Sequence, residues 1–296
     1  MKPAGSDSRT VIEMIDAGAK QLTHAKVAFG HGTANAFDEA VWLVLWQLGL
    51  PLHDLDTVRD KPITSADQIK IAALFEARVR TRKPAAYLTH EAWLMGVPFY
   101  VDERSIVPRS FIGELLAHGA IDSWLGEHTR KVLDLCTGNG SLAVLVAMTY
   151  PDVTVDAADI SADALAVARI NVDKHALADR ITLLQSDGLH SVRGPYDLIL
   201  CNPPYVNTQS MAALPTEYQA EPTLALAGGA DGMDFIRALL RDAPAHMSEN
   251  AVLVLEIGNE RAHFETAFPK LEVVWLATSA GDDQVLLITR EALLEK

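Results

Sequence analysis

The fold class follows from the stretch "VLDLCTGNGSLAV", Val132–Val144. Its first residues are typical of a buried strand, and its last residues are typical of a helix. Gly138 and Gly140 lie between the two. Missing side chains there let a ligand approach the backbone, and the N-terminus of the following helix offers free N–H groups. We therefore expect a strand, a ligand-binding glycine loop and a helix in immediate succession.

The same alternation continues to the end of the chain. From Lys131 onward, short apolar strands alternate with amphipathic helices, as in "TVDAAD", "SADALAVARINVDKHA", "ITLLQSD", "YDLILC", "MDFIRALLRDAPAHM" and "AVLVLEIG". This pattern predicts an α/β fold of the Rossmann-like kind, with a mostly parallel sheet covered on both faces. The last two strands, "LEVVWLATS" and "DQVLLITR", are separated only by "AGD", so they must pair antiparallel.

The N-terminal part has a different pattern of apolar residues. From Thr10 to about Lys83 the apolar positions recur at helical spacing, and Asn35 can cap the second of three helices. The third is predicted to open at Ser65, because Gln68 stands at the capping-box spacing. The stretch "AAYLTHEAWLMGVPFYVDE" then predicts a hairpin. We expect a helical module over residues 1–84, a β-hairpin linker over 85–108 and the α/β domain over 109–296.

Composition excludes several classes of protein. Charged residues make up 22% and hydrophobic residues 49% of the 296, which is the balance of a globular protein. The longest apolar run, "AVWLVLWQLGLPL", is too short to cross a bilayer, and the N-terminus has no apolar signal core. A net charge of −14 opposes binding to a phosphate backbone and suits a basic protein partner. We expect a cytoplasmic protein that contacts neither DNA nor a membrane directly.

Cysteine and histidine give no sign of a metal site. The two cysteines, Cys136 and Cys201, form no CxxC or Cys/His pattern, and the ten histidines show no ligand spacing. We expect two small buried thiols in a reducing compartment and no bound metal.

Acidic residues follow the glycine loop from strand to strand. Asp159 ends the second predicted strand, where a carboxylate can accept hydrogen bonds from both ribose hydroxyls of an adenosine-containing ligand. Asp187 ends the third and is placed to meet the adenine edge. Asp134 precedes the glycines, where it suits a sulfonium or an amino group better than a pyrophosphate, whose charge it would repel. We therefore expect S-adenosylmethionine as the cofactor.

Two alternatives to that cofactor site stay open on these residues. The sequence Gly138-x-Gly140-x-x-Ala143 also fits a dinucleotide fingerprint, which on its own is weak evidence for a dehydrogenase. The glycines can also serve only to make a tight turn.

The second motif is "NPPY", Asn202–Tyr205, at the end of the fourth predicted strand. Ligands of parallel sheets bind beyond the carboxyl ends of the strands, so Asn202 should open onto the same crevice as the glycine loop. Pro203 restricts Asn202 to extended geometry, and Pro204 stiffens the next step. The Asn202 side-chain oxygen and the Pro203 carbonyl are then two acceptors suited to the two N–H bonds of a planar –NH₂ group.

This arrangement predicts methyl transfer to nitrogen. An amide or aromatic-amine nitrogen is a poor nucleophile, because its lone pair is delocalised. Holding both hydrogens to one side, with Tyr205 stacked on the plane, favours pyramidalisation and places the reacting atoms in line. No general base is needed before transfer, since the methylated cation is acidic enough to lose its proton afterwards. The alternative is that the four residues only make a turn after a strand.

Taken together, "DLCTGNG", "AADIS", "SDGL", "NPPYV" and "EPTLALAGGADGMDFIR" resemble the protein glutamine methyltransferases, which methylate a glutamine side-chain amide from S-adenosylmethionine. The resemblance implies a small helical N-terminal substrate-recognition domain, a linking hairpin and a seven-stranded methyltransferase domain. It also implies the roles of particular positions. Cofactor contacts would come from Asp134, Leu135, Cys136, Thr137, Gly138, Gly140, Asp159, Ile160, Asp187 and Asn202, and the substrate glutamine would meet Asn202, Pro203, Pro204 and Tyr205.

Within the family, "FGHGTANAFDEA" and the stretch from Pro84 to Leu116 look like the branch that methylates the third protein of the large ribosomal subunit. The sister branch, which acts on peptide release factors, usually carries a "PRPETE" type stretch where this chain has "PRSFIGE". The chain departs from many methyltransferases at Cys136, which stands at the first loop glycine, although the ribosomal branch tolerates cysteine there. The partner implied is a ribosomal protein, before or during ribosome assembly.

Other functions remain as rivals. They are a release-factor methyltransferase, an adenine amino-methyltransferase, which shares NPPY, and an assembly factor that binds the cofactor without catalysis. Two further residues have alternative roles. Arg109 either lines the pocket or, more simply, is an exposed arginine, and Glu221 either orders the loop over the substrate or caps a turn.

Overall fold

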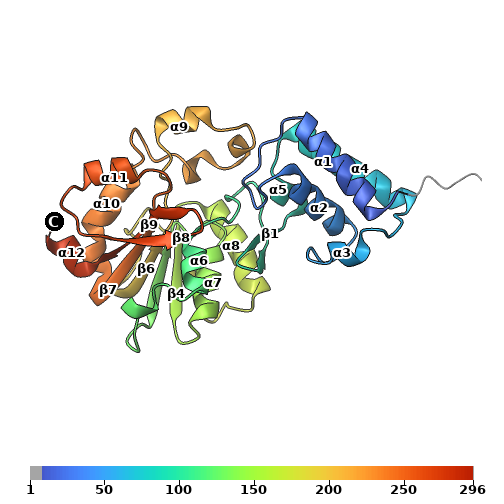
Figure 1. Ribbon diagram of the computed structural model, residues 1–296. Helices are drawn as coiled ribbons and strands as arrows, with labels where there is room; N and C mark the ends of the chain where they lie inside the picture. The colour runs from blue at the N-terminus through green and yellow to red at the C-terminus, as the bar shows by residue number, and fades with distance from the viewer. Residues whose placement is uncertain (1–8, 296) are drawn as a thin grey trace, which may run out of the picture. The chain divides into compact units, whose positions relative to one another are not determined.

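The computed structural model describes residues 9–295 and divides into two compact units. One unit holds the residues up to Glu91 together with Pro215–Ala220, and the other holds Ala92–Leu214 with Glu221 onward. The first is helical and the second contains the sheet (Figure 1). No helix within residues 9–295 is long and apolar enough to cross a membrane.

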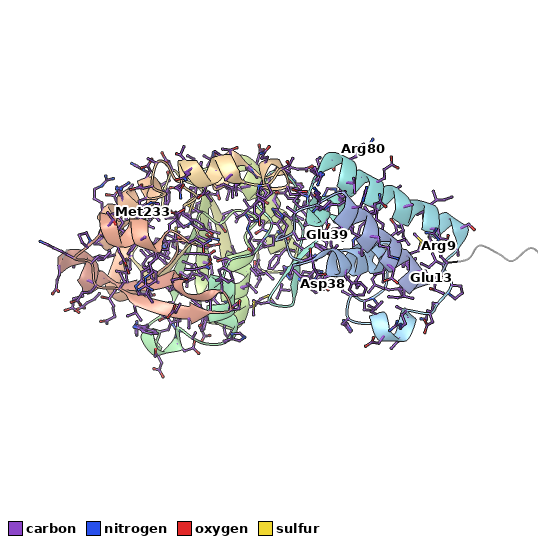
Figure 2. The ribbon with its side chains drawn as sticks, turned by 45° about the horizontal axis from the view of Figure 1, so that its top comes forward. Arg9, Glu13, Asp38, Glu39, Arg80 and Met233 are labelled. Atoms are coloured by element: carbon purple, nitrogen blue, oxygen red, sulfur yellow. The ribbon has the colours of Figure 1, made fainter. Side chains whose placement is uncertain are left out.

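The helical unit contains α1 (Val11–His24), α2 (Ala36–Gln47), α3 (Leu55–Val58), α4 (Ser65–Thr81) and α5 (Ala85–Thr89). Helix α1 begins with a complete capping box, in which Thr10 and Glu13 satisfy each other's backbone N–H groups. Figure 2 labels Glu13 of this helix. Gly18 lets α1 and α4 approach closely, because a Cβ there would stand 2.0 Å from the Phe75 ring. Asn35 caps α2 as predicted, accepting from the Asp38 N–H.

Two local predictions in this region differ from the structure. Helix α4 begins at Ser65 as predicted, but its cap is Thr64, which accepts from the Asp67 N–H, while Gln68 donates to the Ile63 carbonyl. Residues 85–89 form the short helix α5 rather than the start of a hairpin, because Pro84 and the two alanines after it favour a helical first turn.

The hairpin itself is short. Its strands β1 (Ala92–Leu94) and β2 (Val97–Phe99) pair antiparallel and are joined by the two residues Met95 and Gly96. Both have positive φ, 49° and 77°, as a two-residue hairpin turn of type I′ requires.

The larger unit is built on a seven-stranded sheet of order β5-β4-β3-β6-β7-β9-β8. Strands β3 to β7 run parallel, and β9 pairs antiparallel with both β7 and β8, which confirms the predicted α/β fold and its antiparallel end. The order reverses at β3, between β4 and β6, and such a switch point opens a crevice at the carboxyl ends of the strands. The strands are β3 (Lys131–Leu135), β4 (Thr154–Asp159), β5 (Ile181–Gln185), β6 (Tyr196–Cys201), β7 (Met247–Glu256), β8 (Val274–Thr278) and β9 (Gly281–Thr289).

Helices cover both faces of the sheet (Figure 1). Val132 of β3 packs in the core shared with α6 and α7, and the next residue, Leu133, packs in the core shared with α10, α11 and α12. Alternate residues of a strand thus anchor opposite layers. The remaining elements are α6 (Ile112–Ala117), α7 (Ser141–Thr149), α8 (Ala162–Lys174), α9 (Thr208–Ala213), α10 (Asp234–Asp242), α11 (Arg261–Ala267) and α12 (Arg290–Glu295), with single 3₁₀ turns at Asp122–Trp124, Tyr218–Ala220, Thr223–Ala225 and Ala243–His246.

Candidate active site

A cavity lies where β3, β4, β5 and β6 end, wholly within the larger unit. The two sequence motifs meet there: the glycine loop supplies one part of its wall and the NPPY motif another. The predicted site residues that line it are Leu135, Cys136, Gly138, Asp159, Ile160, Asp187, Asn202 and Pro204. Those that do not line it are Asp134, Thr137, Gly140, Pro203 and Tyr205.

The glycine loop has three left-handed residues, and each has a different environment. Gly138, at φ 56°, has open space where a Cβ would stand, so its backbone is accessible from the cavity. Gly140, at φ 79°, is tight against α8, because a Cβ would lie 3.1 Å from that of Ala168. Cys136 has φ 61°, which explains why glycine is the common residue at this position in methyltransferases. Gly140 therefore allows the loop to pack closely against α8, and Gly138 leaves the loop backbone open to a ligand.

Asp134 forms hydrogen bonds to residues of this loop and of α7, and only 1% of its surface is exposed. Its Oδ2 accepts from the Thr137 hydroxyl at 2.5 Å and from the Ala143 N–H at 3.0 Å. Its Oδ1 is buried and makes no hydrogen bond to any of the described residues. Burial raises the pKa of this carboxyl to about 7. The side chain joins the loop to the first turn of α7 and keeps one oxygen free.

Asp159, at the end of β4, lines the cavity and also braces the loop. Its Oδ2 accepts from the Gly138 N–H and its Oδ1 from the Ser161 N–H, both at 2.9 Å. Burial raises its pKa, although the two backbone bonds oppose that shift. Ser161 in turn caps α8 by accepting from the Ala164 N–H. The carboxylate is thus fixed in orientation before any ligand meets it.

The NPPY motif follows β6 directly. Asn202 and Pro204 are half-buried and line the cavity, while Pro203 is buried behind them. Tyr205 is also half-buried but does not line the cavity, and its hydroxyl donates to Glu256 Oε1 at 3.4 Å. The structure brings Asn202 to the same cavity as Gly138 and Asp159, as the strand-end argument predicts.

Arg109 and Glu221 form an ion pair. Both guanidinium nitrogens donate to the carboxylate, at 2.6 and 2.8 Å, and Glu221 also accepts from the Val107 N–H at 2.9 Å. The Arg109 side chain is 26% exposed and does not line the cavity, so neither of the two interpretations of Arg109 holds as stated. Glu221 is 3% exposed and fixes the start of the segment whose residues Pro222, Leu224 and Ala225 line the cavity.

Several lining residues escaped the sequence argument. Ser186 and Gly188 flank Asp187 at the end of β5, so extending the strand-end argument by one residue on each side would have found them. Ala158 and Ser161 lie in the stretch "AADIS", and Pro222, Leu224, Ala225 and Phe235 lie in "EPTLALAGGADGMDFIR", but no role followed for them from their residue types. The missed residues are Arg104, Ser105, Ile106, Ala158, Ser161, Ala164, Ser186, Gly188, Pro222, Leu224, Ala225 and Phe235.

The residues present fit S-adenosylmethionine. The free Oδ1 of Asp134 is a buried acceptor next to the loop, the open backbone at Gly138 admits a close ligand, and Asp159 supplies a fixed carboxylate. Leu135, Ile160 and Phe235 add apolar wall on which a planar base can lie. The cofactor, when bound, supplies a methyl group activated by a sulfonium.

Comparisons with known proteins show the family of the chain. Residues 116–220 match the family model described as the methyltransferase small domain. The chain is 51% identical to the ribosomal protein uL3 glutamine methyltransferase of Bordetella pertussis over 96% of each chain, and 46% identical to that of Neisseria gonorrhoeae over 98% of each. Among solved structures, the hMettl16 catalytic domain in complex with a MAT2A 3′UTR hairpin covers 77% of this chain and 83% of its own with a TM-score of 0.51, at 13% identity, which shows a shared fold.

Proposed function

Because the chain belongs to the family of ribosomal protein uL3 glutamine methyltransferases, we propose that it transfers a methyl group from S-adenosylmethionine to the side-chain amide nitrogen of a glutamine in uL3, the third protein of the large ribosomal subunit. The observation that carries the proposal is the meeting of Asn202 and the Gly138 loop in one cavity at the switch point of the sheet. The dehydrogenase alternative has no support among the relatives, which are named methyltransferases.

Asn202 and Pro203 prepare the nitrogen for attack. The Asn202 side-chain oxygen and the Pro203 carbonyl each accept one N–H of the substrate amide. Both hydrogens are then held on one side, which draws the nitrogen toward a pyramidal shape and directs its lone pair at the methyl group. After transfer, the nitrogen carries a positive charge and releases one proton to water, so no side chain has to act as a base beforehand.

The charge distribution supports a basic protein as the substrate. Residues 1–91 contain eleven Lys and Arg and eleven Asp and Glu, so the whole excess of 14 acidic residues falls within 92–296, which holds the cavity. An acidic surface attracts a basic partner and repels a phosphate backbone. This asymmetry favours a ribosomal protein over DNA, and we further propose that the reaction takes place in the cytoplasm, before or during assembly of the ribosome.

A methyl-transfer assay tests the proposed function. Purified enzyme and labelled S-adenosylmethionine are incubated with uL3 from cells that lack the enzyme, and separately with a release factor. We expect labelled glutamine in uL3 only. Asn202→Ala should lower kcat by about 10²–10³-fold, because one of the two acceptors that orient the amide is lost. The matched control Asn250→Ala, at an exposed position of β7, should retain full activity.

The other outcomes are equally informative. Labelling of the release factor in place of uL3 would assign the chain to the sister activity. Full activity of Asn202→Ala would remove Asn202 from the mechanism. Tight cofactor binding without labelling of either protein would support a non-catalytic assembly factor.

A further inference from the structure

A buried carboxyl group accepts a hydrogen bond from Tyr205, the last residue of the NPPY motif. Glu256 is the last residue of β7 and is 2% exposed. Its Oε2 accepts from the Ser110 hydroxyl at 2.6 Å and from the Phe111 N–H at 2.9 Å. Its Oε1 accepts from the Tyr205 hydroxyl at 3.4 Å. Glu256 therefore joins three segments, of which only Tyr205 belongs to a motif of the proposed reaction.

The environment of Tyr205 leaves its ring and backbone little freedom. A Cβ at Gly258, which has φ 53°, would stand 2.5 Å from a ring carbon of Tyr205, so the ring lies directly on that backbone. A Cβ at Gly228 would stand 2.7 Å from the Tyr205 Cα, and one at Gly232 would stand 2.2 Å from its carbonyl oxygen. Three glycines thus lie against Tyr205, and Glu256 accepts a hydrogen bond from the hydroxyl at the end of its ring.

The Tyr205 hydroxyl and the Glu256 carboxyl form a donor–acceptor pair whose protonation is set by burial and by nearby charges. A carboxylate acceptor binds a hydroxyl more strongly than a neutral acceptor does. The Arg109 guanidinium acts on the same carboxylate and opposes the rise in its pKa, while burial raises that pKa to about 7. Glu256, Arg109 and Glu221 are the charged groups that act on the Tyr205 hydroxyl, and Glu221 is itself paired to Arg109. Burial also raises the pKa of Tyr205, so the phenol stays protonated and remains a donor.

We propose that Glu256 is a positioning residue for the methyl transfer: it fixes the angle of the Tyr205 ring, and the ring covers the plane of the amide that Asn202 and Pro203 hold. The inference rests on the proposed function, because Tyr205 meets substrate only if the NPPY motif binds an amide. A tilt of the ring misaligns the nitrogen with the methyl group without removing either acceptor. Loss of the Glu256 contact should therefore lower kcat and leave the affinity for substrate and cofactor unchanged.

A double-mutant cycle tests the coupling. Glu256→Gln, Tyr205→Phe and the double variant are compared for kcat, for KM of uL3 and for Kd of S-adenosylmethionine. We expect each single variant to lower kcat about 10-fold, with KM and Kd within about twofold of the wild type, and the double variant to be no slower than either single one. The matched control is Glu260→Gln, a buried glutamate bonded to Asn207 and His263, which should keep kcat within about twofold.

A second measurement separates this inference from the proposed function. NMR of ¹³C-labelled tyrosine, with the Tyr205 signal assigned from the Tyr205→Phe spectrum, reports the ring without any substrate. The ring signal should shift and broaden in Glu256→Gln and stay unchanged in Glu260→Gln. If uL3 is not methylated but the ring responds, the proposed function fails and Glu256 still positions Tyr205. Additive losses of kcat, or an unchanged ring signal in Glu256→Gln, would overturn the inference.

Discussion

Burial of Asp134 disfavours the charged form of its carboxyl and raises its pKa. Its carboxyl is inaccessible to water, yet only one of its oxygens has hydrogen-bond partners among the described residues. A residue that served only to support the loop would be equally well replaced by asparagine, which can accept the same two bonds. We propose that the free oxygen of Asp134 instead meets a cationic group of the cofactor.

The raised pKa of Asp134 predicts a pH dependence of stability. A carboxyl whose pKa is about 7 in the folded state and about 3.9 unfolded binds a proton more tightly when folded. Its stabilising contribution is present below pH 4 and is lost as the pH rises to about 7. Without cofactor, Asp134→Asn should therefore raise the free energy of unfolding at pH 8 by on the order of 2–4 kcal/mol and have little effect at pH 4.

Denaturant titrations at the two pH values measure this difference, and the affinity for S-adenosylmethionine is measured alongside. Asp163→Asn, an exposed carboxyl in the first turn of α8, is the control and should not alter the pH profile. An equal effect of Asp134→Asn at both pH values would show that the carboxyl is not strained by burial. Unchanged cofactor affinity would exclude the free oxygen from the cofactor site.

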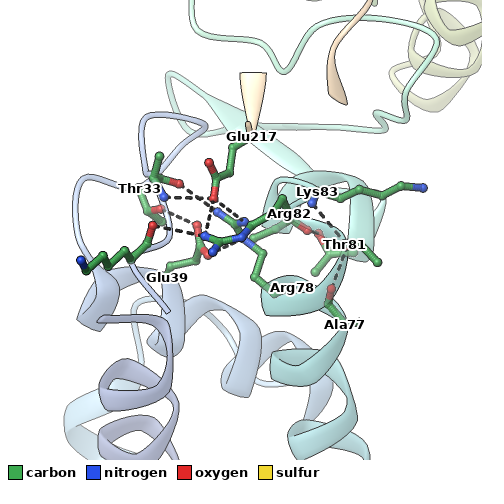
Figure 3. A network of polar contacts seen from close by, with 12 residues as sticks. Thr33, Glu39, Ala77, Arg78, Thr81, Arg82, Lys83 and Glu217 are labelled. Atoms are coloured by element: carbon green, nitrogen blue, oxygen red, sulfur yellow. Dashed lines mark hydrogen bonds and ion pairs between the residues drawn. The ribbon is translucent and has the colours of Figure 1, made fainter. Parts of the chain in front are cut away.

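At the scale of elements, the segment Pro215–Ala220 is the least expected feature. It follows the NPPY loop in the chain but packs within the helical unit. There Glu217, 2% exposed, accepts from the Ala28 N–H at 3.1 Å and lies 3.2 Å from the Arg82 guanidinium and 3.7 Å from that of Arg78 (Figure 3). Arg78 is completely buried and also donates to Glu39 at 2.8 Å. Ion pairs of Glu217 thus attach the segment Pro215–Ala220 to the helical unit.

Removing Glu217 should destabilise that unit. Glu217→Ala leaves Arg78 with one buried carboxylate instead of two, and we expect a loss of about 3 kcal/mol in the free energy of unfolding. The cofactor affinity should stay the same, because every residue that lines the cavity belongs to the other unit. Thermal unfolding and calorimetric titration measure the two quantities. A matched change at an exposed glutamate, Glu76→Ala on α4, should cost less than about 0.5 kcal/mol.

The same contrast shows what the sequence could and could not predict. The alternating strands, the antiparallel end and the meeting of Asn202 with Gly138 follow from local patterns and from the rule that parallel strands end at one edge. The position of Pro215–Ala220 depends on contacts such as Ala28 with Glu217, 189 residues apart, and no local pattern encodes them. Likewise, the sequence indicates alternative roles for Arg109 and Glu221 but not their ion pair, because only the fold brings together residues that are 112 apart.

At the scale of the whole molecule, two kinds of observation converge. The larger unit brings Gly138 of the glycine loop and Asn202 of the NPPY motif to one cavity, and the chain belongs to a family whose members are named for uL3 glutamine methylation. The predicted resemblance to the ribosomal branch is confirmed by identities of 45–51% over nearly the full chain. The recognition of substrate by the helical unit stays a prediction.

Mass spectrometry of uL3 from cells with and without this protein tests the central claim most directly. The account predicts that one glutamine of uL3 carries a single methyl group in the wild type, that the group is absent from the deletion strain, and that a plasmid-borne wild-type copy restores it while Asn202→Ala does not. Unmethylated uL3 in wild-type cells, or a methyl group that persists in the deletion strain, would contradict it.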